Sequence, residues 1–304
     1  MRGGWRCRLG IMLHITEHQV KEILSMRECI RLMRETFQAL REKTATNQPR
    51  RRIVLSTGST LHSMGGSYGK YFGTKFYATN PKHGAHFFFF LFDAATAAPL
   101  AQFEANWLGQ IRTGAASGYA TDVLAAPGAA TLGVIGSGFQ AESQIAAIRA
   151  VRNIQEVRVW SRSEEKRNTF AHMVGARAAE SAEAAVTGAD RVVTATFAGE
   201  PVIDSKWIAD GAHVNAIGSN RINRRELPSD LIVRANLIVC DSIEQAKLEA
   251  GDLAMAPVDW DDPRIAEVAA IERRPAGNPL TIFKSLGLGV EDVATAAWVY
   301  EKLK

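Results

Sequence analysis

A glycine-rich turn between an apolar segment and a helical pattern constrains this chain most strongly. Thr131–Ile135 has the short apolar run of a buried strand, and Gln140–Val151 has the periodicity of a helix. Between them lies a G-x-G-x-x-A turn, and another strand-like segment, Val157–Trp160, begins about 20 residues later. Such glycines let a pyrophosphate approach backbone N–H groups at a helix N-terminus. This context favours dinucleotide binding over an ordinary tight β-to-α turn. The expected cofactor contacts are Gly136, Ser137, Gly138, Phe139 and Gln140.

Short apolar segments and helical segments alternate along the C-terminal half of the chain. Three further strands are expected at Arg191–Thr196, His213–Ile217 and Leu237–Cys240. Buried strands that are joined by crossover helices form a parallel sheet with both faces covered. The sequence therefore predicts an α/β fold, with a Rossmann-type, doubly wound parallel sheet over residues 114–278.

The N-terminal part has a different pattern. Residues 17–43 carry apolar side chains at helical spacing, whereas residues 49–103 alternate strand-like runs with glycine-rich and Asn-Pro turns. This pattern is typical of an α+β domain, which we assign to residues 1–113, with residues 1–11 as a disordered tail. Residues 279–304 contain a strand-like piece and a helix, and we expect this segment to return to the first domain.

Composition excludes several classes of protein. The chain has 304 residues, 46% of them hydrophobic, and a net charge of +4, which is the balance of an ordinary globular protein with two domains. Because Arg2, Arg6 and Arg8 supply three of the positive charges, the remainder lacks the basic face that nucleic-acid binding requires. The longest apolar run, Phe87–Phe92, is far shorter than the roughly 18 residues of a membrane span.

Metal sites and secretion are also disfavoured. The seven histidines form no HExxH motif, and the acidic residues at 259–262 lack the glycine and glutamate of a calcium loop. Cys7, Cys29 and Cys240 are widely spaced and odd in number, which argues against a chelating pair and a disulfide framework. The first eleven residues lack the apolar core of a signal peptide. We therefore expect a cytoplasmic protein without a metal.

The residues after the second strand bear on which dinucleotide binds. An acidic residue at this position would hold the ribose 2′-hydroxyl of NAD, but the chain has Ser161 and Arg162 there. A hydroxyl and a guanidinium suit a 2′-phosphate, which a carboxylate would repel. This favours NADP(H), with NAD(H) as the alternative; Arg162 could also be an ordinary solvated residue at the start of a helix.

Polar residues also lie at the end of the third strand and after the fourth. Thr194 and Thr196 could line the nicotinamide ribose, although threonine is equally a good strand residue. Ser219 and Asn220 follow the fourth strand, at the edge where a parallel sheet binds its ligands. We expect Ser219 to contact the cofactor and Asn220 to lie where a substrate meets the nicotinamide ring.

The first domain supplies candidate substrate ligands. Lys75 lies in a strand-like run of aromatic residues, where alternation places it on the face opposite Phe76. Arg112 lies where the first domain leads into the second, and its neighbour Thr113 is a further candidate cofactor contact. An arginine can hold a substrate carboxylate with two parallel hydrogen bonds, although an interdomain salt bridge would also explain it.

These motifs together resemble the ornithine cyclodeaminase/μ-crystallin family from Met12 to the C-terminus. The resemblance implies a homodimer, in which each subunit has a Rossmann domain and an α+β domain for substrate binding and dimerisation. Its members exchange hydride at a carbon that bears nitrogen and a carboxylate. The segments that carry the resemblance are Gly73–Phe76, Asp93–Thr96, Ile111–Ser117, Ile135–Ala141, Gly218–Leu227 and Thr281–Gly287.

The resemblance also implies roles for particular residues. The family's carboxylate-binding positions fall on Arg112, Lys75 and Arg51, with Arg52 as a rival to Arg51 in a cluster that could also be a solvated charge run. Lys75 would support the carboxylate or supply a proton. The catalytic aspartate of the cyclodeaminases is replaced by Asn220, which cannot take up a proton but can orient a ring nitrogen through hydrogen bonds.

The resulting hypothesis is an NAD(P)H-dependent reductase of cyclic ketimino acids. It would convert Δ1-pyrroline-2-carboxylate or Δ1-piperideine-2-carboxylate into proline or pipecolate. The alternatives are an NAD-dependent ornithine cyclodeaminase or alanine dehydrogenase, and a non-catalytic, NADP-binding, crystallin-like protein. Lys75 and Arg112 argue against the last of these, because a scaffold has no need of them.

Overall fold

The computed structural model describes residues 12–128 and 130–304, and the chain divides into two compact units. The first unit contains the residues up to Ser25 together with Glu42–Gly109 and Leu288–Lys304. The second contains Met26–Arg41 and Gln110–Gly287. The main boundaries lie near the expected ones at 113 and 278, but both units are discontinuous, because Met26–Arg41 belongs to the second unit. The expected disordered tail at residues 1–11 lies outside the described residues.

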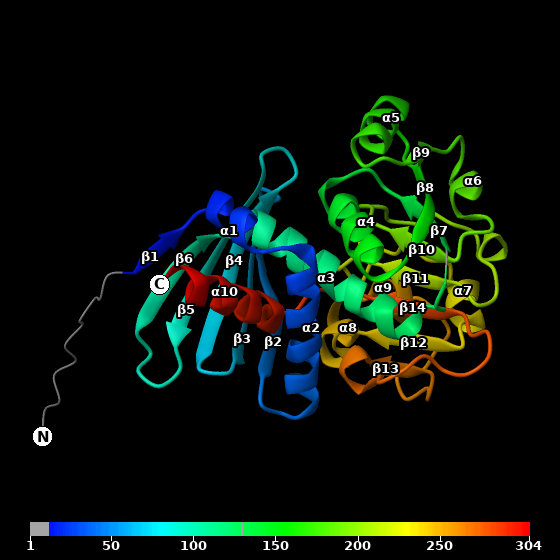
Figure 1. Ribbon diagram of the computed structural model, residues 1–304. Coiled ribbons are helices and arrows are strands. Elements are labelled where there is room, and N and C mark those ends of the chain that lie inside the picture. The colour runs from blue at the N-terminus through cyan, green and yellow to red at the C-terminus, as the bar shows by residue number, and fades with distance from the viewer. Residues whose placement is uncertain (1–11, 129) are drawn as a thin grey trace, which may run out of the picture. The chain divides into compact units, whose positions relative to one another are not determined.

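The first unit is built on a six-stranded sheet (Figure 1). Its strand order is β1-β6-β5-β4-β3-β2, and every pairing is antiparallel except that of β1 with β6. This arrangement confirms the α+β pattern expected from the glycine-rich and Asn-Pro turns. The strands are β1 (Leu13–Ile15), β2 (Thr46–Val54), β3 (Thr60–Tyr68), β4 (Tyr71–Asn80), β5 (Gly84–Asp93) and β6 (Pro99–Glu104).

The two faces of this sheet differ in burial because side chains alternate along each strand. One face carries Met64, Lys75 and Phe89, which are directly opposite one another on β3, β4 and β5 and are all buried. The other face carries large apolar side chains that remain exposed in the single chain: Ile53, Leu61, Phe72, Phe76 and Phe88.

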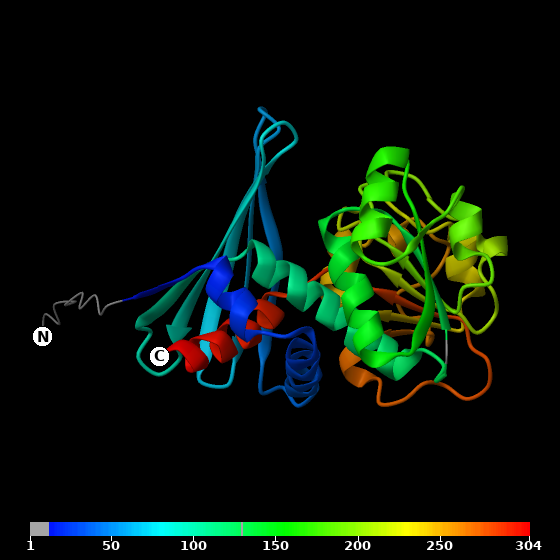
Figure 2. The same cartoon turned by 45° about the horizontal axis from the view of Figure 1, so that its top comes forward.

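Helix α10 (Gly289–Leu303) packs on the buried face of the sheet (Figure 2). Its backbone approaches β3 so closely that side chains would not fit between them. A Cβ at Gly66 would lie 2.7 Å from Cα of Val290, and one at Gly289 would lie 2.4 Å from the carbonyl oxygen of Gly65. Glycines therefore allow the start of α10, with its acidic first turn, to reach the sheet.

The single helix expected over residues 17–43 is two helices. Helix α1 (Glu17–Ile23) begins with a capping box between Thr16 and Gln19 and ends at Leu24, whose backbone is extended. Helix α2 (Met26–Arg41) then starts again. The apolar spacing continues across the break, so periodicity alone does not reveal that α1 belongs to the first unit and α2 to the second.

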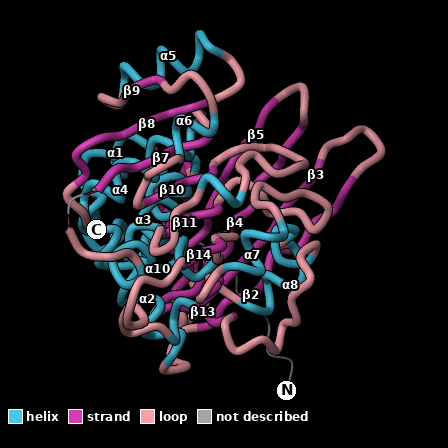
Figure 3. The backbone as a smooth tube through the Cα atoms, turned by 90° about the vertical axis from the view of Figure 1, so that its right-hand side faces the viewer, coloured by secondary structure: helices cyan, strands magenta, loops and turns pink. Residues whose placement is uncertain are grey.

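The second unit contains an eight-stranded sheet in which every pairing is parallel. Its strands are drawn in magenta in Figure 3. The strand order is β13-β12-β14-β11-β10-β7-β8-β9. From β7 the chain continues to β8 and β9 on one side of β7, and β10 then lies on the other side, so the strand order reverses at β7. This confirms the predicted doubly wound fold, whose ligands bind at such a switch point. The strands are β7 (Ala130–Ile135), β8 (Ile154–Trp160), β9 (Arg177–Ala178), β10 (Arg191–Thr194), β11 (His213–Ala216), β12 (Leu237–Cys240), β13 (Ile265–Glu267) and β14 (Thr281–Lys284).

Strand β14 lies inside this parallel sheet, between β11 and β12. The sequence pattern had grouped it with α10 in a segment that returns to the first domain, and for β14 that expectation is wrong. All four residues of β14 are buried, and a strand buried on both sides carries no alternation that would distinguish an inner strand from an edge strand. Only α10 belongs to the first unit.

Helices and two apolar clusters cover the faces of the parallel sheet. Neighbouring residues of one strand enter different clusters, as Val192 and Val193 of β10 do. No helix among residues 12–128 and 130–304 is long and apolar enough to cross a bilayer. The helices of this unit are α2, most of α3 (Asn106–Leu124), α4 (Phe139–Val151), α5 (Glu164–Met173), α6 (Ala182–Val186), α7 (Ser229–Arg234), α8 (Ile243–Glu249) and α9 (Gly251–Ala254), with short 3-10 turns η1 (Ser205–Trp207) and η2 (Val268–Ala270).

A buried histidine in β11 predicts acid sensitivity of the fold. His213 is fully buried, its Nδ1 lies 2.9 Å from the Thr281 hydroxyl, and burial lowers its pKa from 6.5 to about 3. Between these two pH values the unfolded chain binds the extra proton, so stability falls as the pH falls, by at most about 1.4 kcal/mol per pH unit. Urea unfolding between pH 7 and 4.5 should show a smaller loss for His213→Gln. His172→Gln, at an exposed position of α5, should keep the wild-type slope; equal slopes for all three proteins would contradict the assignment.

Candidate active site

The predicted dinucleotide turn connects β7 to α4 in the second unit. Gly136 adopts φ +122°, its N–H donates to the Trp160 carbonyl at 2.8 Å, and a Cβ there would lie 2.4 Å from the carbonyl oxygen of Ala195. A residue with a side chain would therefore be strained and would also collide with the end of β10. The turn needs glycine at this position to pass between β8 and β10.

The start of α4 has the properties of an anion site. Gly138 is the N-cap, and among the described residues no side chain caps the helix or approaches within 4 Å of the place a Cβ would take. The first N–H groups of a helix have no intrahelical partners, and they carry the positive end of its dipole. Phe139 is half exposed beside them. These residues fit the pyrophosphate of a dinucleotide.

A serine pair links the ends of β7 and β8. The Ser137 hydroxyl donates to the Ser161 hydroxyl at 2.9 Å, and Arg167 donates to the Ser161 carbonyl at 3.0 Å. Arg162 is exposed just before α5, whose N-cap is Ser163, and it forms no hydrogen bond or ion pair with any residue in the described part of the chain. Its guanidinium is available to a ligand at the position where an adenosine ribose binds in such folds.

A buried carboxylate ties together the ends of β10 and β11. Glu226 accepts hydrogen bonds from both the N–H and the hydroxyl of Thr196 at 2.6 and 2.7 Å, from the Thr194 hydroxyl at 3.1 Å, and from the Gly218 N–H at 2.7 Å. Both threonine hydroxyls, which we expected to line a ribose, therefore donate their hydrogen bonds to Glu226. Thr194 is also fully buried, which places it behind the strand end rather than at a ligand surface.

Lys284 and Asp252 complete this cluster. Lys284 Nζ lies 2.9 Å from Asp252 Oδ2 and donates to the Ser219 carbonyl at 2.6 Å, while Asp252 Oδ1 accepts from the Glu226 N–H at 2.6 Å. Burial acts to lower the pKa of Lys284, but the carboxylates of Asp252 and Glu226 outweigh it and raise that pKa. Burial raises the pKa of Glu226, against the effects of Lys284 and Thr196. Sequence reasoning missed this cluster; the available signal was a lysine closing an apolar strand.

The loop after β11 is held by this cluster and by its own hydrogen bonds. Ser219 is buried, and its hydroxyl donates to the Arg224 carbonyl at 2.9 Å. Asn220 follows as a half-buried residue. The structure therefore places Asn220 at the carboxyl edge of the parallel sheet, as the sequence predicts, and directs the Ser219 hydroxyl into the loop.

Arg112 lies in α3 against the loop that follows β14. The side chain is buried, and a Cβ at Gly287, whose φ is +76°, would lie 2.4 Å from a guanidinium nitrogen of Arg112. Asp241, at the end of β12, holds this loop by accepting from the N–H groups of Leu286 and Gly287 at 2.6 and 2.7 Å. The carbonyl of Thr113 accepts from Gln144 at 3.3 Å. Gly287 thus leaves room for the arginine.

Lys75 lies on the buried face of the sheet in the first unit. Only 3% of its surface is exposed, and Nζ lies 3.1 Å from Asp292 Oδ1 of α10. The sequence placed Lys75 correctly on the face opposite Phe76. Asp292, its partner 217 residues away, carries no sequence signal that links it to β4.

The strand register separates the two rival arginines. Arg51 is opposite Ser63 and exposed, whereas Arg52 is opposite His62, which lies on the same face as Met64 and Lys75. A register shift between Gln48 and Arg51 causes this arrangement; it contains Pro49, which cannot donate to a neighbouring strand. Arg52 therefore shares the face of Lys75, and Arg51 points to the opposite face.

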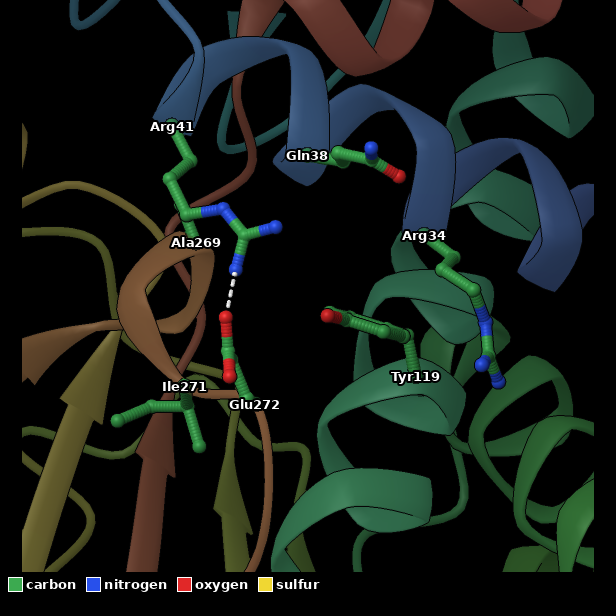
Figure 4. A pocket seen from close by; sticks show the side chains of 7 residues that line it. All are labelled: Arg34, Gln38, Arg41, Tyr119, Ala269, Ile271 and Glu272. Carbon is green, nitrogen blue, oxygen red and sulfur yellow. Dashed lines mark hydrogen bonds and ion pairs between the residues drawn. The ribbon is translucent and has the colours of Figure 1, made fainter.

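The structure thus gathers the candidate residues in two groups. The second unit brings the glycine turn, the serine pair, Asn220 and Arg112 to the loops of its parallel sheet, and the first unit holds Lys75 and Arg52 on one sheet face. A cavity of about 210 Å³ elsewhere in the second unit contains none of these residues (Figure 4). Its charged lining is already paired, since Arg41 lies 2.8 Å from Glu272.

Known proteins include clear relatives of this chain. The family model described as the ornithine cyclodeaminase/mu-crystallin family matches residues 12–304. A Delta(1)-pyrroline-2-carboxylate reductase of Bacillus cereus is 40% identical over 227 residues, which cover 70% of this chain and 69% of the relative. The ketimine reductase mu-crystallin of Mus musculus is 38% identical over 213 residues, or 69% and 67% of the two chains.

Solved structures match nearly the whole chain. The Delta(1)-pyrroline-2-carboxylate reductase of Thermococcus litoralis in complex with NADH and L-proline is 30% identical and has a TM-score of 0.89. The match covers 96% of this chain and 97% of the reductase chain. An archaeal alanine dehydrogenase dimer with bound NAD has the same identity and TM-score, with 95% of each chain covered. This chain belongs to the ornithine cyclodeaminase/mu-crystallin family.

Proposed function

We propose that this protein is an NAD(P)H-dependent reductase of cyclic 2-imino acids. Its substrates would be Δ1-pyrroline-2-carboxylate or Δ1-piperideine-2-carboxylate, and its products proline or pipecolate. One observation carries the proposal: a single chain combines a dinucleotide turn with two buried cations, Lys75 and Arg112. Buried cations suit a small anionic substrate, because a carboxylate can offset the cost of keeping charges away from water. The names of the relatives support the same reaction.

The side chains have separate tasks in this reaction. Lys75 and Arg112 bind the substrate carboxylate, and the register of β2 favours Arg52 over Arg51 as a further ligand. Asn220 accepts a hydrogen bond from the protonated ring nitrogen. When bound, the reduced dinucleotide supplies the hydride to C2, and the C=N electron pair moves onto nitrogen. The contribution of the protein is positioning and electrostatic stabilisation.

The alternatives make different demands on residue 220. Deamination of ornithine requires a base that accepts a proton from the substrate, and an amide cannot do so. Asn220 therefore favours reduction of an existing imine over oxidative deamination. A non-catalytic protein would bind the dinucleotide equally well but would have no use for Lys75 and Arg112.

Cofactor oxidation tests the proposal directly. NADPH and NADH oxidation should be followed at 340 nm with each cyclic imino acid, with ornithine plus NAD and alanine plus NAD as comparison reactions. We expect turnover of the imino acids and formation of the matching amino acid. Ammonia release from ornithine or alanine at a higher kcat/KM would replace this proposal by one of the alternatives, and the absence of all turnover would support the non-catalytic one.

We further propose a preference for NADPH that depends on Arg162. A charge-assisted hydrogen bond contributes about 1.5–3 kcal/mol, so Arg162→Ala should raise the KM for NADPH about 10- to 100-fold and leave the KM for NADH nearly unchanged. Arg177→Ala is a matched control, because Arg177 is exposed in the same unit but pairs with Glu156. Parallel changes for both cofactors in Arg162→Ala would contradict the proposed contact with a 2′-phosphate.

We also propose a cytoplasmic homodimer that forms through the exposed face of the six-stranded sheet. The five exposed apolar side chains on β2 to β5 form a surface of the kind that another subunit covers. The related alanine dehydrogenase is a dimer. The buried, free thiol of Cys240 is compatible with a reducing compartment.

A further inference from the structure

The ammonium group of Lys75 has a buried partner on another element. Lys75 belongs to β4, and Asp292 belongs to the first turn of α10, which packs across that strand (Figure 1). Nζ lies 3.1 Å from Oδ1, and Asp292 has no exposed surface. A lone ammonium would be costly at this depth, and a carboxylate within hydrogen-bond distance offsets that cost.

The surroundings restrict where Nζ can lie. The Phe87 ring centre lies 5.5 Å from it, within the range of a cation–π contact. On another side, a Cβ at Gly109 would lie 2.5 Å from Nζ. The cross-strand neighbours Met64 and Phe89 are buried beside the lysine stem. The ammonium is thus confined between a carboxylate, an aromatic ring and the backbone of α3.

Lys75 and Asp292 differ in what they can bind. The ammonium group of a protonated lysine has three donor hydrogens and can bind more than one carboxylate. Asp292, in contrast, is an acceptor that cannot bind a substrate carboxylate itself. The two residues therefore have different tasks: Lys75 binds the substrate carboxylate, and Asp292 binds Lys75.

We propose that Asp292 is a positioning residue that keeps Lys75 charged and directs its Nζ toward the substrate carboxylate. This inference rests on the proposed function, and it resolves the two roles left open for Lys75. A lysine held as an ammonium by a buried carboxylate serves as an anion ligand throughout the reaction and is not the source of a proton.

Other titratable groups near β4 must be considered in any pH experiment. His62 on β3 and Tyr77 on β4 stack on the same sheet face, with ring centres 4.1 Å apart. Arg50 on β2 is buried beside Met64, and Glu291 is buried next to Asp292 on α10. The Asp292→Asn exchange keeps all four side chains. Because Lys75 Nζ lies 3.1 Å from the exchanged carboxylate, we expect the Lys75 pair to cause the largest change in the pH profile.

The test is the kinetic behaviour of Asp292→Asn with the cyclic imino acid that the wild type turns over. We expect the KM for the imino acid to rise about 10- to 100-fold, because the charge-assisted contact to Lys75 is weakened. The dissociation constant for NADPH should stay unchanged. The alkaline limb of kcat/KM should move to lower pH, because a buried ammonium without its carboxylate loses its proton more readily. Glu301→Gln is the matched control: Glu301 is also on α10 and pairs with Lys70 at 2.9 Å, and its loss should leave KM and pH profile unchanged.

Two results with Asp292→Asn would overturn the inference. One is a wild-type KM and pH profile. The other is an equal loss of imino-acid and NADPH binding, or a lower active fraction with an unchanged KM, which would indicate a purely structural role. A wild type without any turnover would instead refute the proposed function, and the inference with it.

A second variant covers the case in which Asp292→Asn does not fold. Gly109→Ala keeps both charges but crowds Nζ, whose flexible stem can yield. We expect a KM for the imino acid raised about tenfold, equivalent to about 1.4 kcal/mol, with unchanged NADPH binding. An unchanged KM in Gly109→Ala would contradict the claim that Asp292 and the groups around it fix the position of Nζ for substrate binding.

Discussion

Replacing Lys75 with methionine is expected to lower kcat/KM for the cyclic imino acid about 1000-fold, or about 4 kcal/mol of transition-state stabilisation. Methionine has nearly the length of lysine but offers no charge to the substrate carboxylate. The measurement is NADPH oxidation under kcat/KM conditions. Lys70→Met is the control. Lys70 is an exposed lysine in the turn between β3 and β4, and this variant should retain wild-type activity.

Loss of activity must be separated from loss of stability in this variant. Lys75→Met leaves Asp292 buried without its cation, which is destabilising. In the double variant Lys75→Met/Asp292→Asn, both members of the pair are neutral, so stability should return toward that of the wild type while activity stays lost. A Lys75→Met protein that retains more than about a tenth of the wild-type kcat/KM would show that Lys75 is not a substrate ligand.

The second large effect is expected on stability. Lys284→Met should lower the free energy of unfolding by about 3–5 kcal/mol, because it leaves the carboxylates of Glu226 and Asp252 without a cation in a fully buried site. Urea unfolding at pH 7.5 measures the loss. Lys206→Met, which removes an exposed ion pair with Asp204, should change stability by less than about 0.5 kcal/mol.

The pH dependence of this effect has a definite sign. In the wild type the pKa of Lys284 is raised on folding, so its contribution is fully present below the unfolded pKa of about 10.4 and is lost as the pH rises through the folded pKa. In Lys284→Met, burial raises the pKa of Glu226 without an opposing cation. The deficit of the variant should therefore shrink as the pH falls and Glu226 takes up a proton. A deficit under about 1 kcal/mol at pH 7.5 would contradict the structural role of Lys284.

The parallel sheet was predictable because its signals are local. Strand β7, the glycine turn and α4 lie consecutively in the chain, and each has its own pattern of apolar residues or glycines. The need for glycine at 136 follows from the turn as well as from the nearby end of β10. The same reasoning failed for β14, because a fully buried strand of four residues carries no signal for its neighbours in the sheet.

Threonines and arginines at the candidate site show the limit of local patterns. Their place at the end of the third strand suggested Thr194 and Thr196 as ligand contacts, but both hydroxyls donate to Glu226, which is at least 30 residues away in the chain. Adjacent arginines at 51 and 52 look equivalent in the sequence. A register shift in β2 decides which of them shares a face with Lys75, since a displacement by one residue exchanges the two faces of a strand.

The amino-acid order alone thus specified the alternation of strands and helices, the dinucleotide turn, the family and the residue types suited to an anionic substrate. The folded chain decided their partners: Asp292 for Lys75, Asp252 and Glu226 for Lys284, and the loop at Gly287 for Arg112. The physical reason is distance along the chain. Periodicity and turn chemistry act over a few residues, whereas a buried charge is stabilised by whichever opposite group the packing of distant elements brings within about 3 Å.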